Sequence, residues 1–178
     1  MTVRMTKEAI ERALNVLVGK AMTGSSRAVD MEMFHFGDQV EFTDGRGRVL
    51  VGSEYGLHVQ APWRIERFGR LVVGYRDMRD PPSGVDLSGF DPNDAPLTRR
   101  DELIEAFHAK RRDRPRLVVR CDARSAGGVR LTFDDASVLE IFPDSAAADD
   151  EYWRLLGPDE EHTVATGAGL LRPGPRSQ

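Results

Sequence analysis

The chain has 178 residues, of which 40% are apolar and 30% charged, an ordinary composition for a soluble globular protein. Its net charge of -4 argues against a general nucleic-acid binder, and no apolar run approaches the roughly 18 residues of a membrane helix. Cys121 is the single cysteine, which excludes an internal disulfide framework and a cysteine metal cluster. Together with an N-terminus unlike a signal peptide, these features predict a cytoplasmic protein.

The first predicted element is an amphipathic helix. It is expected to begin near Thr6, a residue suited to cap a helix N-terminus, and to end at residues 24–26, Gly-Ser-Ser. Ile10, Leu14 and Leu17 fall on one face of this helix at helical spacing. That face is expected to pack on the rest of the domain.

Strand signals follow the helix. Residues 31–43 alternate imperfectly between apolar and polar side chains, and residues 44–45, Asp-Gly, suit a hairpin turn. In residues 57–61, Leu-His-Val-Gln-Ala, the alternation places His58 and Gln60 on the strand face opposite to the apolar residues. A hairpin with one apolar and one polar face is therefore predicted.

Residues 70–77 are a further strand candidate, and the Pro-, Gly- and Asp-rich residues 80–97 are typical of a long loop or linker. Thr98 is predicted to cap a second helix, with Asp101 in the reciprocal capping position. Another strand and hairpin are expected after this helix. Residues 157–178, which end in a Gly- and Pro-rich stretch, are predicted to form a flexible tail.

A sequence phrase recurs in the two halves of the chain. Trp63 follows Phe42 by 21 residues, Trp153 follows Phe133 by 20, and each Trp precedes an Arg and an aliphatic residue. A single hairpin cannot bury its apolar face alone, so two such units would share a core. We therefore predict an α+β fold in which two helix plus antiparallel β-hairpin units form one pseudo-symmetric domain. The predicted units are residues 1–79 and 98–156.

The phrase "YGLHVQAPWRI" carries a family resemblance. It resembles a group of small bacterial proteins of actinobacterial type, of uncharacterised function, that contain an LHVQ-x-PWRI phrase. Some small proteins of this kind lie beside toxin genes and are suspected immunity proteins. The resemblance covers residues 40–80, and "LEIFP" with "EYWRLL" forms a looser second match. It implies an interaction protein and no catalytic residues; members have Cys where this chain has Ala61, so no thiol role transfers.

The candidate binding site lies in the same phrase. His58 and Gln60 project from one face of a strand and are followed by Trp63 and Arg64, and such polar and aromatic groups are enriched at interfaces. A satisfied polar network, a buried Trp and an Arg paired with a carboxylate explain the same residues structurally. We predict a binding site of His58, Gln60, Trp63 and Arg64, without a catalytic residue.

No spacing in the sequence indicates a metal ion or a cofactor. The histidines and Cys121 lack the short pairings of zinc ligands. The glycines of residues 43–49 join two predicted strands, whereas a phosphate-binding loop leads into a helix. The basic residues 110–116 suit a helix C-terminus and need no nucleic acid to explain them.

Acidic residues concentrate toward the C-terminus. From Leu131 to Gln178, ten acidic residues oppose three basic ones, so this part carries -7 and the rest of the chain +3. A surface of this kind keeps a protein soluble or attracts a basic partner. We predict a non-enzymatic protein-binding domain, of the immunity type, with a basic protein as its partner. The alternatives are a small-ligand-binding protein or enzyme with a site between the two halves, and a structural homodimer.

Overall fold

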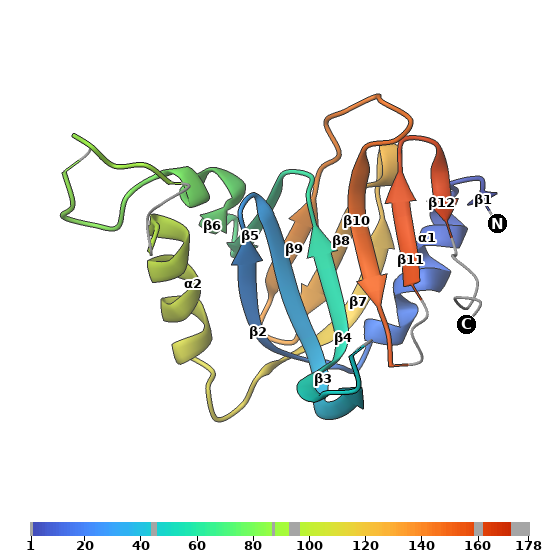
Figure 1. Cartoon of the computed structure of the whole chain (residues 1–178), viewed down its shortest axis with the longest axis horizontal. Coiled ribbons are helices and arrows are strands. Elements are labelled where there is room, and N and C mark those ends of the chain that lie inside the picture. Colours follow the sequence, from blue (N-terminus) through green and yellow to red (C-terminus); the bar gives the residue numbers. More distant parts are fainter. Residues whose placement is uncertain (1, 44–45, 87, 93–96, 159–161, 172–178) are drawn as a thin grey trace.

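The computed structural model describes residues 2–43, 46–86, 88–92, 97–158 and 162–171. Over these residues the fold is mixed and mostly β, as a sheet of twelve strands carries two α-helices and three short 3₁₀ segments (Figure 1). The α+β class expected from the sequence is confirmed at this level. Within the same residues, no helix is long and apolar enough to cross a membrane.

The helical elements are α1 (Lys7–Leu14), η1 (Asn15–Leu17), η2 (Tyr75–Arg79), α2 (Arg99–Ala109) and η3 (Ser125–Gly127). The strands are β1 (Thr2–Val3), β2 (Ala21–Ala28), β3 (Met31–Thr43), β4 (Val49–Val59), β5 (Trp63–Arg67), β6 (Arg70–Gly74), β7 (Arg116–Ala123), β8 (Val129–Phe133), β9 (Ser137–Ile141), β10 (Glu151–Leu156), β11 (His162–Thr166) and β12 (Gly169–Leu171).

The strands follow the order β1-β12-β11-β10-β4-β3-β2-β7-β8-β9-β5-β6, and the paired neighbours are antiparallel. The pairing passes from β2 to β7 through only two residue pairs, Ala21–Leu117 and Met22–Arg116. In Figure 1, β2, β3, β4, β10, β11 and β12 lie in front, and β7, β8, β9 and β5 lie behind them. The sheet is thus folded into two layers.

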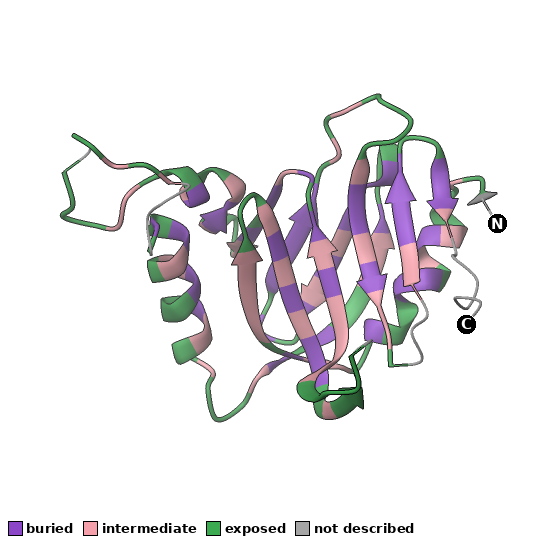
Figure 2. Ribbon diagram, in the orientation of Figure 1, coloured by how far each residue is buried: buried purple, intermediate pink, exposed green. Residues whose placement is uncertain are grey.

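The core lies between these layers. Alternate residues of the strands point inward, as expected for the period of two in a strand, and Figure 2 shows this alternation along the front strands. Phe34 of the front layer meets Trp63 of the back layer edge to face, with ring centroids 5.2 Å apart. Trp153 is also buried, and its Nε1 donates to the carbonyl of Gly127 at 2.9 Å. Both tryptophans are therefore buried in the core, as the structural explanation of the sequence pattern required.

The two helices begin as predicted. The Thr6 hydroxyl accepts a hydrogen bond from the Ala9 amide at 3.2 Å, and the Thr98 amide donates to Asp101 Oδ2 at 2.7 Å. These caps satisfy amides that a helix N-terminus leaves without partners. α1 contacts β7, α2 contacts β6 and η2, and the two helices lie at opposite ends of the molecule in Figure 1.

The predicted end of the first helix was wrong. Helical structure ends at Leu17, and residues 24–26 lie within β2, paired with His35, Phe34 and Met33. Gly19 has φ +84°, a left-handed conformation that glycine adopts without the steric cost of a Cβ atom. Helical structure thus ends seven residues before Gly24, and Gly19 lies in the turn that leads to β2.

The predicted flexible tail was wrong for residues 162–171, which form β11 and β12. Val164, Ala165 and Leu170 are buried there, because β11 pairs with β10 and β12 pairs with β11 and β1. Residues 159–161 and 172–178, and the predicted turn at residues 44–45, lie outside the described residues.

The other elements expected in the middle of the chain fit the structure with one difference. The strand expected over residues 70–77 ends at Gly74, and Tyr75–Arg79 form η2. The described part of residues 80–97 has neither a helix nor a strand, in agreement with a loop.

Candidate functional site

The four residues predicted to bind do not form one site. His58 lies on β4 in the front layer, and Gln60 follows that strand and is exposed. Trp63 is in the core. Arg64 lies on β5 in the back layer, where it bonds Glu140 at 2.6 Å and covers the ring of Phe142 at 4.8 Å. The expected pairing of Arg64 with a carboxylate is therefore observed.

His58 belongs to a groove on the outer face of the front layer. Along β4, Gly52, Glu54, Gly56 and His58 share the outer face, since they alternate with Ser53, Tyr55 and the core residue Leu57. Gly56 lies directly between its two cross-strand partners, His35 of β3 and Leu156 of β10, and Leu156 in turn lies beside His162 of β11. One row of residues thus crosses four strands.

The groove has a volume of about 340 Å³. Two glycines form part of its floor: a Cβ at Gly52 would lie 2.9 Å from Phe42 Cε1, and one at Gly56 would lie 3.3 Å from His58 Nε2. The rings of Phe42 and His58 therefore rest on the bare backbone of β4. The complete lining is His35, Val40, Glu41, Phe42, Thr43, Gly52, Ser53, Glu54, Tyr55, Gly56, His58, Leu156, Gly157, Pro158 and His162.

Two imidazoles in the groove, those of His35 and His58, have lowered pKa values, which favours their neutral form. Burial, and to a smaller extent the nearby positive charges, lowers the pKa of His58, and burial lowers the pKa of His35. Nε2 of His35 lies 2.9 Å from the Ser26 hydroxyl. A neutral imidazole keeps one nitrogen as an acceptor, so these rings can accept as well as donate hydrogen bonds.

Two cations already face this side of the sheet, and each has a carboxylate partner. Lys20 Nζ bonds both oxygens of Glu54, at 2.7 and 2.8 Å. Arg154, beside His58, bonds Glu151 at 2.6 Å. Glu41 is exposed, and its pairing with Val51 places its side chain on the face of β3 opposite to that of Phe42.

The described residues contain no group of three or more histidine, cysteine, aspartate or glutamate side chains arranged to hold a metal ion. Cys121 lies on β7, in the other layer from the groove. Burial raises the pKa of its thiol to about 12, which disfavours the reactive thiolate.

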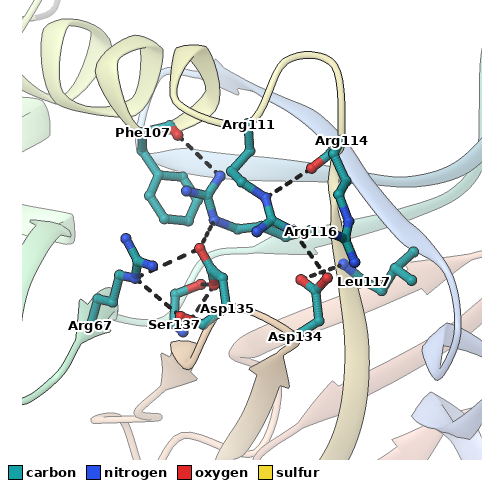
Figure 3. A network of polar contacts seen from close by, with 9 residues as sticks. All are labelled: Arg67, Phe107, Arg111, Arg114, Arg116, Leu117, Asp134, Asp135 and Ser137. Atoms are coloured by element: carbon teal, nitrogen blue, oxygen red, sulfur yellow. Dashed lines mark hydrogen bonds and ion pairs between the residues drawn. The ribbon is translucent and has the colours of Figure 1, made fainter.

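Three of the basic residues in the segment 110–116, namely Arg111, Arg114 and Arg116, take part in one network of polar contacts within the fold (Figure 3). Arg116 is buried, bonds Asp135 at 2.8 Å and lies 3.6 Å from the ring centroid of Phe107. Arg111 bonds Asp134 at 3.0 Å. The two acidic residues of the β8–β9 turn are thus held by the segment after α2, in line with its interpretation as a helix end.

Sequence reasoning found His58 but missed most of the groove. The sequence did contain one signal, because a glycine at every fourth residue of an alternating strand, Gly52 and Gly56, leaves that face open. His35, Phe42 and His162 join them only through strand register, which a single sequence does not give.

Comparisons of the chain with protein-family models, with curated proteins and with solved structures found no match.

Proposed function

We propose that the protein is a non-enzymatic protein-binding domain of the immunity type, which binds a basic partner through the groove on the outer face of β3, β4, β10 and β11. The observation that carries this proposal is an indented sheet face beside an exposed apolar arm. Neither helix packs on that face: α1 contacts β7, and α2 contacts β6 and η2 (Figure 1).

The arm consists of the ends of β3 and β4 that extend past their neighbours. β2 pairs with β3 only as far as Phe36, and β10 pairs with β4 only from Gly56 onward. Beyond these points Phe42, Val49 and Val51 are 48%, 65% and 62% exposed, and exposed residues dominate this end in Figure 2. Apolar side chains on strands with unpaired edges are typical of an interaction surface.

The charge of the groove supports a basic partner. Glu41 and Glu54 line it, and its two described imidazoles with lowered pKa values carry no charge at neutral pH. A surface that is acidic overall attracts basic proteins and speeds their association. The immunity type comes from the resemblance of residues 40–80 to a group of uncharacterised small bacterial proteins, since some small proteins of this kind are suspected immunity proteins. Under this proposal the acidic surface of the protein masks a basic toxin. Asp159, Glu160 and Glu161, counted in the acidic C-terminal part, lie outside the described residues.

We also propose that the domain is built from two related units. Outward from the β2–β7 pair, the strands run β3, β4, β10 on one side and β8, β9, β5 on the other. In the chain, β3, β4 and β5 follow α1, and β8, β9 and β10 follow α2. The two Trp-containing strands are therefore exchanged between the sets, since β5 pairs with β9 and β10 pairs with β4. Under this proposal the groove lies between the units, with His35 and His58 from the first and Leu156 from the second, while His162 comes from the segment after the second unit.

The alternative of a small-ligand site is favoured by the size of the groove. Its volume of about 340 Å³ falls within the range of about 300–1,000 Å³ common for small-molecule sites. Its mixture of apolar walls and a few polar groups suits such a ligand as well.

The test is affinity capture of the tagged protein from lysate of its own organism, at low and moderate salt, with two matched variants. Phe42→Ser removes an aromatic ring from the groove, and Phe68→Ser removes an even more exposed ring from the turn between β5 and β6. A basic protein captured by wild type and Phe68→Ser, but not by Phe42→Ser, supports the proposal. No specific protein, or equal capture by both variants, contradicts it; a small molecule that instead saturates the groove would favour the alternative.

A further inference from the structure

The edge of β2 that faces away from β3 is paired along only part of its length. β7 pairs with this edge at Ala21 and Met22, and among the described residues no strand pairs with it from Gly24 to Ala28. The backbone groups of a strand alternate between its two edges, so about half of the N–H and C=O groups of residues 24–28 point away from β3. An open edge of this kind is a template for another strand.

A slot separates this edge from α2. It has a volume of about 260 Å³, and its lining comes from β2, from α2 and from the segment that follows α2. In Figure 1, β2 is the outermost strand of the front layer and α2 lies beyond it. Side chains connect the two elements, because Arg100 bonds the Ser25 hydroxyl at 2.7 Å and Asp101 lies 3.4 Å from Arg27. These contacts hold α2 beside β2 without using the backbone groups of the edge.

One buried polar atom in the slot lacks a partner. Nε2 of His108, on α2, makes no hydrogen bond within the described part of the chain. A buried polar atom of this kind calls for a group that the fold itself does not supply. The charged residues that line the slot are Arg111, Arg112, Arg116 and Glu105. The lining thus carries more positive than negative charge, which favours an anionic group such as a carboxylate.

We propose that the free edge of β2 binds an extended segment of a partner protein as an added strand, with a glutamate side chain of that segment in the slot. Every second side chain of an added strand would point between β2 and α2. There the methylene groups of the glutamate lie against Met22 and Ile104, which line the slot, and its carboxylate accepts a hydrogen bond from Nε2 of His108. The inference goes beyond the proposed function, because the slot and the groove share no lining residue.

Arg112 is the cation best placed to bond the incoming carboxylate. Arg111 and Arg116 are held by the two acidic residues of the β8–β9 turn. Arg112 bonds Glu105 at 2.7 Å, but the two side chains are 72% and 68% exposed, and such a pair contributes little to stability. Because a guanidinium has several N–H donors, Arg112 can bond the carboxylate of the partner as well as Glu105.

The inference can be tested with three synthetic peptides and NMR of the full chain. The first peptide is acetyl-Thr-Val-Thr-Glu-Thr-Val-Thr-amide, and the second has Gln in place of Glu. The third is the first with N-methyl groups on the Glu and on the Thr that follows it. Of two successive residues in a strand, one faces the neighbouring strand, so the third peptide loses a hydrogen bond to β2.

The first peptide should shift the amide signals of residues 24–28 and the imidazole signals of His108. It should leave the imidazole signals of His58, which lines the groove, unchanged. The second peptide lacks the charge and the third lacks a backbone donor, so each should bind at least about tenfold more weakly than the first.

Matched variants locate the carboxylate. Arg112→Glu should weaken binding of the first peptide at least about tenfold. Arg120→Glu is the control and should alter binding by less than about threefold. The Arg120 side chain is equally exposed, at 71%, and also bonds a carboxylate, that of Asp122 at 2.6 Å, but it does not line the slot. Equal binding of the first peptide and either of the others, equal effects of the two variants, or no shift at residues 24–28 at the highest peptide concentration would each overturn the inference.

Discussion

Arg100 of α2 and Glu32 of β3 form an ion pair in which both side chains are buried. Arg100 Nε donates to Glu32 Oε2 at 2.8 Å, and the Arg100 guanidinium also bonds Glu32 Oε1 and the Ser25 hydroxyl. Burial raises the pKa of Glu32, and Arg100 opposes that rise. This pair joins elements 68 residues apart in the chain and fixes α2 against the inner side of the front layer.

Removing one member of this pair should destabilise the fold strongly. Arg100→Leu leaves a buried carboxylate without its cation, for which we expect a loss of about 3–5 kcal/mol in the free energy of unfolding. The double variant Glu32→Leu/Arg100→Leu should recover a large part of that loss. Arg99→Leu is the control, because Arg99 is half exposed and its ion pair with Asp77 is long at 3.6 Å. Urea unfolding measures all three; a loss in Arg99→Leu equal to that in Arg100→Leu would contradict the account.

Asp135 is expected to stabilise the protein in a pH-dependent way. Burial alone would raise the pKa of Asp135, but the hydrogen bonds from Ser137 and the charge of Arg116 lower it overall (Figure 3). A carboxyl group with a lowered pKa contributes stability above its unfolded pKa of about 3.9, and that stability is lost as pH falls through the folded pKa.

Asp135→Asn should therefore destabilise the protein by about 3–5 kcal/mol at pH 7, since it leaves the buried Arg116 without its anion. The adjacent Asp134→Asn should cost less, about 1 kcal/mol, because the asparagine side chain can still accept the hydrogen bond from the Leu117 amide. Unfolding free energies at pH 7 and pH 3 give both comparisons. If Asp135→Asn lost as much stability as the wild type on acidification, the assigned role of this carboxylate would be wrong.

The sequence predicted those features of the fold that depend on residues close together in the chain, and it did not predict those that depend on distant residues. The caps at Thr6 and Thr98 need only the next three residues, and both were predicted. The pairing of β10 with β4 joins residues nearly a hundred positions apart, which no local pattern encodes. The strands at residues 162–171 were missed for the same reason, since their few apolar residues suffice only because neighbouring strands cover them.

The candidate site, too, was predicted only where its residues lie in one local strand pattern. His58 was predicted because it lies within an alternating strand, whereas its neighbours His35 and Leu156 are placed by cross-strand register. Arg64 was misplaced, because after Ala61 the chain leaves the front layer and β5 joins β9 in the back layer. Proximity in sequence across Pro62 therefore did not mean proximity in space.

Protonation of His108 should weaken the fold at mildly acidic pH. Burial lowers the pKa of His108 to about 4, and its Nε2 is buried without a hydrogen-bond partner among the described residues. The unfolded chain, with a histidine pKa near 6.5, then binds more protons between about pH 6.5 and pH 4, so stability falls over this range by up to about 3 kcal/mol. His108→Leu should reduce that loss, although His35 and His58 keep part of it. Unfolding free energies at pH 7, 5.5 and 4 test this; an unchanged pH dependence in the variant would contradict it.

The two tryptophans should differ in their sensitivity to the same substitution. Both are buried, but the Nε1 of Trp153 bonds the Gly127 carbonyl, whereas the Nε1 of Trp63 has no partner within the described residues. Trp153→Phe leaves a buried carbonyl without its donor, and Trp63→Phe removes an unpaired donor. We expect Trp153→Phe to be more destabilising by about 1–3 kcal/mol. Chemical unfolding of the two variants gives the difference directly, and equal losses would contradict this assignment.

A larger side chain on the floor of the groove should weaken partner binding without lowering the free energy of unfolding. At Gly56 an added Cβ would lie 3.3 Å from His58 Nε2 and 3.8 Å from Leu156 Cδ1, both ends of side chains that can move. Gly56→Val should therefore keep the unfolding free energy within about 1 kcal/mol, because valine suits a strand and the backbone is not left-handed there. The isopropyl group would occupy the open volume between His35 and Leu156, so partner capture should fall at least about tenfold. Gly74→Val, on β6 in the other layer, is the matched change, since a Cβ there meets neighbours at an ordinary 3.6–3.8 Å. Binding that survives in folded Gly56→Val, or that is lost equally in folded Gly74→Val, would show that the partner does not enter the groove.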